Sequence, residues 1–315
     1  MYVRYDASSI VLLQDGITYL LGISALTESG DASPSVILIY NSENLIDWNY
    51  ISTISPPAPT TSVKIPSLYI KTNGDVLVVA PNSLSSTTNR IIGYTSSDNG
   101  TTWSSYFVIR ENVSEYMAPA SNRLHLSDSG RLVFPFNINT NGILNSQTGN
   151  YTGKVMYSDD EGENWSTSVS SIVSVDNLCV ENGIFKKETG TIVNYFRTRS
   201  NSVYASNSTD DGETWGAVYN LGIGAIDSQS TVLRLSSGNF VAAFNPVPSR
   251  SVMQVVKSTN GTSWSDYFLL NSEAPYHFIE PSIVEKNDKL YVFYSKSNST
   301  QSQWSLAVKD IRIDY

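Results

Sequence analysis

The sequence predicts an all-β chain, folded as a six-bladed β-propeller in which residues 1–315 form a single domain. Three observations lead to this prediction. A short phrase ending in tryptophan recurs along the chain, with 55, 62, 50 and 49 residues between successive tryptophans. Pairs of short apolar runs joined by a turn occur six times, and five of these turns contain glycine. No segment keeps the apolar period of a helix. A repeat of this length is typical of stacked β units such as propeller blades.

The repeated phrase has the chemistry of a tight turn. Its Asp or Asn caps nearby N–H groups, its Gly adopts positive φ, and its Trp gives the turn a large apolar anchor. The pattern Ser-x-Asp-x-Gly-x-Thr-Trp is the Asp-box. We therefore interpret the box carboxylates as structural rather than catalytic or calcium-binding. The five copies end at Trp48, Trp103, Trp165, Trp215 and Trp264.

Each unit is expected to begin with two apolar strands around a turn and to continue into its box. In the first unit these strands are residues 9–13 and 19–21, separated by Gln14-Asp15-Gly16. The sixth unit has no box and is expected to end near Trp304. The corresponding stretches of the other units are residues 66–79, 120–134, 181–196, 232–244 and 282–294.

Composition excludes several classes of function. The net charge is −9 and there is no basic run, so neither nucleic acid nor an anionic membrane is an expected partner. No stretch approaches the roughly 20 apolar residues of a membrane span. His125 and His277 do not have metal-ligand spacing, and we expect no metal or other cofactor. Cys179 is the only cysteine and is interpreted as a small buried residue.

Localisation is indicated only by composition. The N-terminus lacks the basic and apolar segments of a secretory signal. The chain is rich in Ser, Thr and Asn and poor in Lys, which is typical of extracellular and virion proteins. We therefore expect an extracellular or virion-associated protein.

Boxes on a six-unit β array resemble the sialidase (neuraminidase) superfamily of BNR-repeat proteins, and the resemblance covers the whole chain. It implies a propeller of sialidase type with a central pocket at one end of the blades. The same scaffold also serves lyases, arabinanases and inactive binding proteins, so activity depends on the residues at the pocket.

The resemblance implies a catalytic acid and a pair formed by a Glu and an Arg. Asp31, in Gly30-Asp31-Ala32-Ser33-Pro34, lies where the family has its acid/base Asp, on a loop before the first box. Glu181 and Arg197 have the spacing of the family's activating Glu and of an Arg that binds the substrate carboxylate. A simple turn at Asp31, and a purely structural Glu181–Arg197 pair, are the alternatives.

The resemblance also implies further cations that would bind the substrate carboxylate. Arg250 precedes the fifth box, as the family's next substrate-binding arginine does, and guanidinium groups suit bidentate binding of a carboxylate. Arg4 is the candidate from the first unit, although Asp6 falls where the family's arginine is expected. In the second unit, Lys64-Ile65-Pro66 imitates the family's Arg-Ile-Pro pattern with lysine.

The nucleophile departs from the family pattern. Sialidases use a tyrosine at the start of the last blade, and the matching position here is Glu280. Tyr276 lies four residues upstream and would reach the site only if the loop differed. Glu280 is therefore either a nucleophile or base for a neutral or differently charged sugar, or the sign of a pocket that has lost catalysis.

Three functions follow from these observations. The first is a retaining exo-glycoside hydrolase acting on an acidic terminal sugar such as sialic acid, with Asp31, Glu181 and Tyr276 in the catalytic roles. The second is a non-catalytic propeller that binds a glycan, such as a receptor-binding protein of a phage. The third is a structural propeller for protein contacts. The first two predict an oligosaccharide or glycoconjugate as partner.

Overall fold

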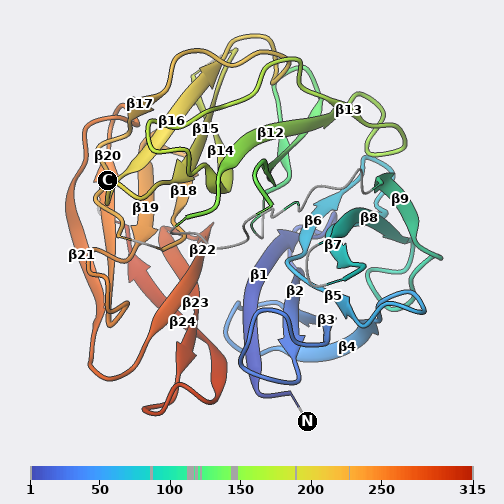
Figure 1. Cartoon of the computed structure of the whole chain (residues 1–315). Helices are drawn as coiled ribbons and strands as arrows, with labels where there is room; N and C mark the ends of the chain where they lie inside the picture. The colour runs from blue at the N-terminus through green and yellow to red at the C-terminus, as the bar shows by residue number, and fades with distance from the viewer. Residues whose placement is uncertain are drawn as a thin grey trace.

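The computed structural model describes residues 2–85, 88–111, 117, 120, 123–142, 148–188, 190–226 and 228–313. These residues form strands, turns and bends without a helix, so the predicted all-β class is confirmed. Figure 1 shows the sheets arranged around a common centre, with β1 (Arg4–Leu12), β14 (Val180–Glu188), β18 (Thr231–Arg234) and β22 (Phe278–Lys286) on its inner side. The arrangement is that of a propeller.

Within the described residues, the strands form five hydrogen-bonded sheets rather than six separate ones. The first sheet has nine strands and contains two antiparallel stretches, β1 to β4 and β6 to β9. The two-residue strand β5 (Ser62–Val63) joins them, through a parallel pair with β3 and an antiparallel pair with β7. The prediction of six separate blades therefore does not describe the hydrogen bonding. The other strands of this sheet are β2 (Tyr19–Leu26), β3 (Ser35–Ser42), β4 (Asn49–Ile54), β6 (Ser67–Ile70), β7 (Val76–Ser83), β8 (Asn89–Ser96) and β9 (Phe107–Arg110).

The remaining sheets follow in chain order. Three are four-stranded and the last is three-stranded. The third unit consists of β10 (His125–Leu126), β11 (Leu132–Asn139), β12 (Tyr151–Ser158) and β13 (Ser166–Thr167). In the next sheet, β14 is followed by β15 (Thr191–Arg197), β16 (Val203–Ser208) and β17 (Tyr219–Asn220). In the sheet after it, β18 is followed by β19 (Phe240–Phe244), β20 (Val252–Ser258) and β21 (Ser265–Ser272). The last sheet adds β23 (Lys289–Ser297) and β24 (Trp304–Arg312) to β22.

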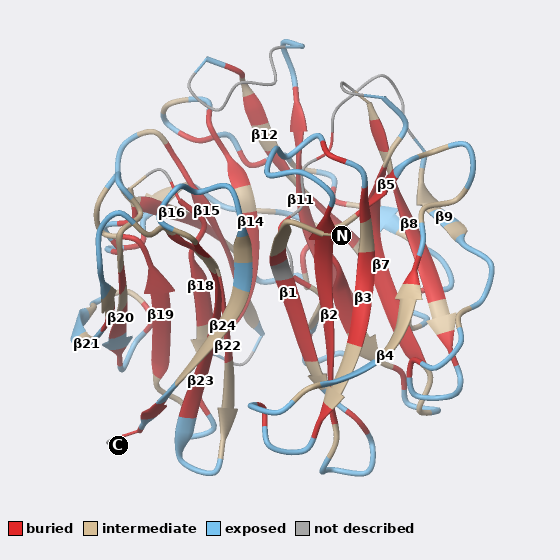
Figure 2. Ribbon diagram, turned by 90° about the horizontal axis from the view of Figure 1, so that it is seen from below, coloured by how far each residue is buried: buried red, intermediate tan, exposed pale blue. Residues whose placement is uncertain are grey.

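Apolar side chains of neighbouring sheets pack together in buried clusters. Figure 2 shows that the middle strands are mostly buried and that many of the turns are exposed. The gap between the last and the first sheet is closed by a cluster that includes Ile10, Leu21 and Phe293. A backbone hydrogen bond of 2.8 Å from Trp304 N to Val3 O crosses the same junction. The ring is therefore closed by both apolar packing and hydrogen bonding.

The box tryptophans belong to these inter-sheet clusters, as the structural interpretation of the boxes predicts. Trp103 packs with residues of the first two units, and its indole N–H donates to Ser52 Oγ at 3.0 Å. Trp48 lies edge-on to Phe293 of the last sheet, with ring centroids 5.9 Å apart. Trp165, Trp215 and Trp264 occupy corresponding positions in the clusters between later sheets.

The strand registers place the boxes at one end of the sheets. Ser42, which begins the first box, pairs with Tyr19 at the start of β2, whereas Leu26 at the other end of β2 pairs with Arg4. The opposite end of the sheets is therefore left for loops and for the starts of β1 and the other inner strands. The described residues contain no helix with the length and apolarity that a bilayer crossing requires.

Candidate functional site

A cavity of about 450 Å³ lies at the end of the sheets opposite to the boxes. Its volume falls within the usual range for small-molecule sites. Strands of four sheets contribute to its wall, and the unit of β18–β21 contributes through the residues before β18 and β20, so residues far apart in the sequence meet there. Its charged lining residues are Arg4, Asp6, Asp31, Lys64, Glu181, Arg197, Arg250 and Glu280.

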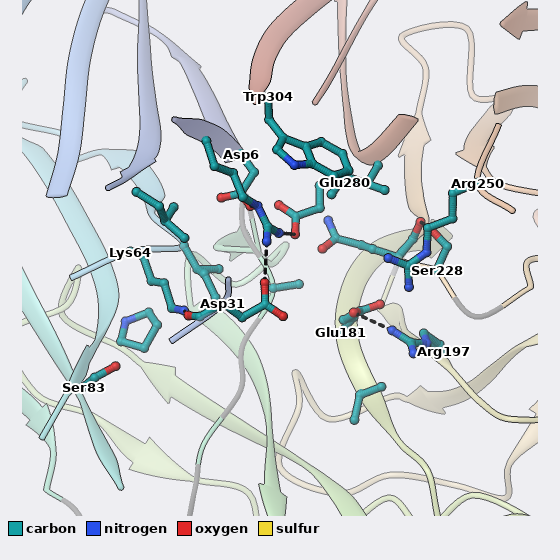
Figure 3. Close-up of a pocket in the computed structure, with 18 of the residues that line it drawn as sticks. Asp6, Asp31, Lys64, Ser83, Glu181, Arg197, Ser228, Arg250, Glu280 and Trp304 are labelled. Atoms are coloured by element: carbon teal, nitrogen blue, oxygen red, sulfur yellow. Dashed lines mark hydrogen bonds and ion pairs between the residues drawn. The ribbon is translucent and has the colours of Figure 1, made fainter. Parts of the chain in front are cut away.

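The structure brings together seven of the eight residues singled out in the sequence. Asp31, Glu181 and Glu280 are the acids, and Arg4, Lys64, Arg197 and Arg250 are the cations. Figure 3 shows Asp31 and Glu280 toward one side of the cavity and the Glu181–Arg197 pair on the other. The eighth residue, Tyr276, is not part of the cavity wall.

Tyr276 has a structural environment instead. Its N–H donates to Glu273 O at 3.1 Å, and its ring packs against the apolar cluster between the last two sheets. The Lys296 ammonium lies 4.6 Å from the ring centroid. The expectation that Tyr276 reaches the site is therefore corrected: it precedes β22, and the residue that turns inward from that strand is Glu280.

Two of the acids owe their positions to irregularities in the inner strands. The β14–β15 register shifts between Val180 and Gly183, and the β22–β23 register shifts between Ile279 and Ser282. Glu181 and Glu280 lie within these shifts with φ of 53° and 54°. Such a bulge re-aims a side chain, and a left-handed backbone at a non-glycine residue is uncommon outside turns and functional sites.

Arg250 shares this backbone conformation, with φ of 53°. It lies before β20, and its carbonyl oxygen accepts a hydrogen bond from Phe278 N at 2.9 Å. That bond ties the loop of the fifth unit to the start of β22. His277, next to Phe278, also lines the cavity, and burial together with the Arg250 charge lowers its pKa.

Arg4 is the centre of the most highly charged part of the site. Its Nη1 donates to Asp31 Oδ1 at 2.6 Å, its Nε is paired with Asp6 Oδ2, and its Nη2 lies 3.9 Å from Glu280 Oε1. The Arg4 and Asp6 side chains are only 11% and 6% exposed, whereas Asp31 is 86% exposed. Burial opposes the charge of Arg4, but the three carboxylates outweigh it and raise its pKa. The Arg4 guanidinium therefore forms ion pairs with three acidic side chains.

Lys64 approaches the same group from the second unit. Its Nζ donates to the carbonyl oxygen of Asp31. Burial lowers the pKa of Lys64, and the charges of Asp31 and Asp6 counteract that effect. The loop that carries Asp31 is thus held from two sides, by Arg4 at the side chain and by Lys64 at the backbone.

Glu280 is an acid whose proton affinity is strongly altered. Burial raises its pKa to about 8, and the neighbouring charge of Asp6 adds to the effect while Arg4 opposes it. Its Oε2 is buried and accepts no hydrogen bond among the described residues. A carboxyl group with such a pKa still carries its proton at neutral pH and can donate it.

Glu181 and Arg197 form the second charged pair, across the β14–β15 strands. Arg197 Nη1 donates to Glu181 Oε1 at 2.8 Å, and the Arg197 side chain is 8% exposed. Glu181 Oε2 is buried and has no hydrogen-bond partner among the described residues. The ion pair with Arg197 therefore engages only one carboxylate oxygen of Glu181, a residue that lines the cavity.

Sequence reasoning missed several cavity residues. Asp6 was noticed only because it stands at the family's arginine position, and Trp304 only as the end of the last unit. Trp304 lines the cavity, with its ring centroid 5.5 Å from the Arg4 guanidinium carbon. His277 lies 6.2 Å from the Trp304 ring, edge to face. A tryptophan outside any box was the available signal for this group.

Comparison with known proteins agrees with the fold. Residues 37–292 match the family model described as a BNR repeat-like domain. An anhydrosialidase from Macrobdella decora is 27% identical over 185 residues, which are 55% of this chain and 22% of that protein. This chain therefore spans less than a quarter of that curated relative.

Solved structures with the same architecture include two from different organisms. A protein of unknown function from Dyadobacter fermentans superposes with a TM-score of 0.78 at 14% identity, covering 99% of this chain and 96% of that one. A Trypanosoma rangeli sialidase in complex with the inhibitor DANA superposes with a TM-score of 0.77 at 16% identity. That match covers 98% of this chain and 55% of the sialidase chain. At these identities the likeness concerns the fold.

Proposed function

Since the chain belongs to the BNR repeat-like domain family of the sialidase superfamily, we propose that its cavity binds the terminal sugar of a glycan and hydrolyses the glycosidic bond. The single observation that carries this proposal is the arrangement of Asp31 and Glu280 against the guanidinium of Arg4. Most glycoside hydrolases use two carboxyl groups that flank the scissile bond, one protonated and one ionised.

Their different environments support different roles for the two carboxyl groups. Glu280, largely buried and with its pKa raised to about 8, is the proton donor. Asp31, exposed and paired with Arg4, is the carboxylate that attacks the anomeric carbon. This assignment exchanges the role that the family resemblance gives to Asp31. It follows the general rule that neighbouring carboxyl groups with contrasting surroundings divide the acid and base work.

The reaction proceeds in two balanced steps. Glu280 gives its proton to the leaving oxygen as the glycosidic C–O bond breaks and a bond forms between the anomeric carbon and Asp31. Ionised Glu280 then takes a proton from water, whose oxygen displaces Asp31 and yields the free sugar. Contact of both carboxylates with one guanidinium supports a short separation, as in retaining enzymes.

The Glu181–Arg197 pair and Arg250 are placed to orient the sugar from the other side of the cavity. Neither needs to take part in bond breaking. Hydrogen bonds from a bound sugar to such fixed groups hold the anomeric carbon in reach of the reacting carboxylate.

For the scaffold, we further propose that the nine-stranded sheet represents two blades joined by β5, which gives a six-bladed propeller in one domain. Two consecutive antiparallel stretches, β1 to β4 and β6 to β9, support this division. The pair Ser35–Ser62 is the sole backbone register pair recorded between β3 and β5 in the described residues.

Hydrolysis is tested with a panel of chromogenic glycosides that includes sialosides, uronides, amino sugars and neutral sugars. Release from at least one member is expected, with loss of about a thousandfold in kcat/KM for Glu280→Gln and for Asp31→Asn. Glu43→Gln is the matched control, because it removes one exposed carboxylate in the first box. Proton NMR of the first-formed anomer checks retention.

Two results would contradict the proposal. Turnover that survives in both variants would remove Asp31 and Glu280 from the mechanism. Saturable sugar binding in this cavity without release from any glycoside would favour the non-catalytic glycan-binding function instead.

A further inference from the structure

We propose that the sugar bound by this cavity is neutral, without the carboxylate that gives a sialic acid its charge. The inference rests on the proposed glycan-binding function of the same cavity and specifies its substrate class. It follows from how the cations of the site are already engaged, and from which acceptor atoms remain.

Arg4 cannot offer its guanidinium to a substrate carboxylate without losing protein partners. Its three nitrogens face Asp6, Asp31 and Glu280, respectively. The Asp6 side chain is buried beside it, with only 6% of its surface exposed, so it has little access to solvent as an alternative partner. A ligand carboxylate would therefore displace Asp31 and then stand next to two further acids.

The cations nearest to the other acids are engaged in a similar way. Arg197 donates from Nη1 to Glu181, and Lys64 donates to the backbone of the Asp31 loop. Two guanidinium groups of the wall are therefore already paired with carboxylates of the protein, Arg4 with Asp6 and Asp31 and Arg197 with Glu181. A ligand carboxylate at either of them would have to replace one of these partners.

The proton affinity of Glu280 indicates that this part of the cavity disfavours a further negative charge. Burial raises its pKa, and the nearby acids Asp6, Glu181 and Asp31 each add to the increase. The same surroundings would act on a ligand carboxylate placed beside Glu280, because low solvent access and like charges disfavour any ionised group.

Two carboxyl oxygens of the cavity are available to bind the hydroxyl groups of a sugar. Glu181 Oε2 and Glu280 Oε2 are buried and have no hydrogen-bond partner among the described residues. Both residues line the cavity, from the inner strands β14 and β22. Buried polar atoms are rarely left without partners, and the hydroxyl groups of a neutral sugar are suitable donors.

The experiment measures binding and turnover separately with the full chain. Isothermal titration calorimetry compares methyl glycosides of neutral sugars, glucosamine, glucuronic acid and N-acetylneuraminic acid at pH 7. The best neutral glycoside is expected to bind about tenfold more tightly, or better, than either acidic one. Asp31→Asn removes an exposed charge beside Arg4 and is expected to strengthen binding of the acidic glycosides by about tenfold.

Glu43→Gln is the charge-matched control that should leave all affinities unchanged. Preference for an acidic glycoside, preference for glucosamine, or acidic binding that does not respond to Asp31→Asn would each overturn the inference. Failure of all glycosides to bind would overturn it as well. Neutral sugars that bind tightly without being hydrolysed would refute the proposed hydrolase and leave the substrate class standing.

Discussion

The two ends of this propeller use the same chemical group, the carboxylate, in opposite ways. In the second box, Asp98 accepts hydrogen bonds from Thr102 N and Thr102 Oγ1 at 2.8 and 2.6 Å and from Ser96 Oγ at 2.8 Å. These bonds hold the pKa of Asp98 down, at about 2. In the cavity, burial raises the pKa of Glu280 to about 8. A carboxylate in a box is stabilised as an anion, whereas Glu280 is stabilised as an acid.

The difference teaches how structural and chemical carboxylates can be told apart. The box acid is satisfied by residues within four positions in the chain, on a surface turn. The cavity acids depend on partners from other sheets, and they include atoms that have no hydrogen-bond partner among the described residues. Perturbed proton affinity combined with incomplete satisfaction is typical of functional sites.

The largest effect that would sharpen this comparison is expected from Arg4→Gln. Removing one partner of a buried ion pair leaves the other charge uncompensated, which costs about 3–5 kcal/mol of unfolding free energy. Chemical denaturation at pH 8 measures it. Adding Asp6→Asn to Arg4→Gln should recover part of the loss, since the buried charge is removed as well.

The matched control is the exposed pair of Lys289 and Asp310, whose nitrogen and oxygen are 2.7 Å apart. Lys289→Gln should leave the denaturation midpoint nearly unchanged, because exposed pairs are screened by water and salt. Equal effects of Lys289→Gln and Arg4→Gln would break the distinction between the two kinds of pair.

An intermediate effect is expected on the pH dependence of stability. The pKa of Glu280 is raised on folding, from 4.5 to about 8, so its contribution is complete below about pH 4.5 and is lost as the pH rises through 8. The unfolding free energy should fall by a few kcal/mol over this interval, and Glu280→Gln should remove most of the fall. Urea denaturation at pH 5, 6, 7, 8 and 9 checks this.

The box acid should give the opposite sign. The pKa of Asp98 is lowered, from 3.8 to about 2, so its contribution is present above about pH 4 and is lost as the pH falls toward 2. Asp98→Asn should therefore lower the unfolding free energy above about pH 4, and it should change the pH dependence of stability only on the acid side. A change in the slope above pH 5 in Asp98→Asn would show that the two ends are not independent.

These two ends also differed in how far the sequence predicted them. A box is local: its serine, acid, glycine and tryptophan are spaced for one turn, and their recurrence predicted the all-β class and the propeller arrangement. The short strand β5 carries no such signal. Two residues, Ser62 and Val63, merge what the repeat pattern predicts as separate blades into one sheet.

The sequence predicted which residues line the site better than it predicted how they are arranged. The resemblance to the sialidase superfamily identified Asp31, Glu181, Arg197, Arg250 and Glu280 as site residues, and all five line one cavity. Which residue of the last unit turns inward depends on the bulge at Glu280, and φ of 54° at a glutamate has no local sequence signature. The engagement of Arg4 by three acids likewise depends on contacts between residues up to 276 positions apart, which one sequence does not reveal.

The smallest effect is expected from Ser158→Ala in the third box. Ser158 Oγ donates to Asp160 Oδ1 at 2.8 Å and accepts from Gly162 N at 2.8 Å, and the residue is buried. Alanine would leave the buried Gly162 N–H without its acceptor, at a cost of about 1–2 kcal/mol in unfolding free energy. Thermal denaturation should show a lower midpoint, and Ser208→Ala, with the same bonds in the fourth box, should give a similar decrease. Because both serines lie at the end of the sheets away from the cavity, the fall in stability between pH 5 and 9 should keep its size in each variant. A loss of that fall would mean that the boxes set the positions of Asp6 and Glu280, and that local turns at one end control proton affinity at the other.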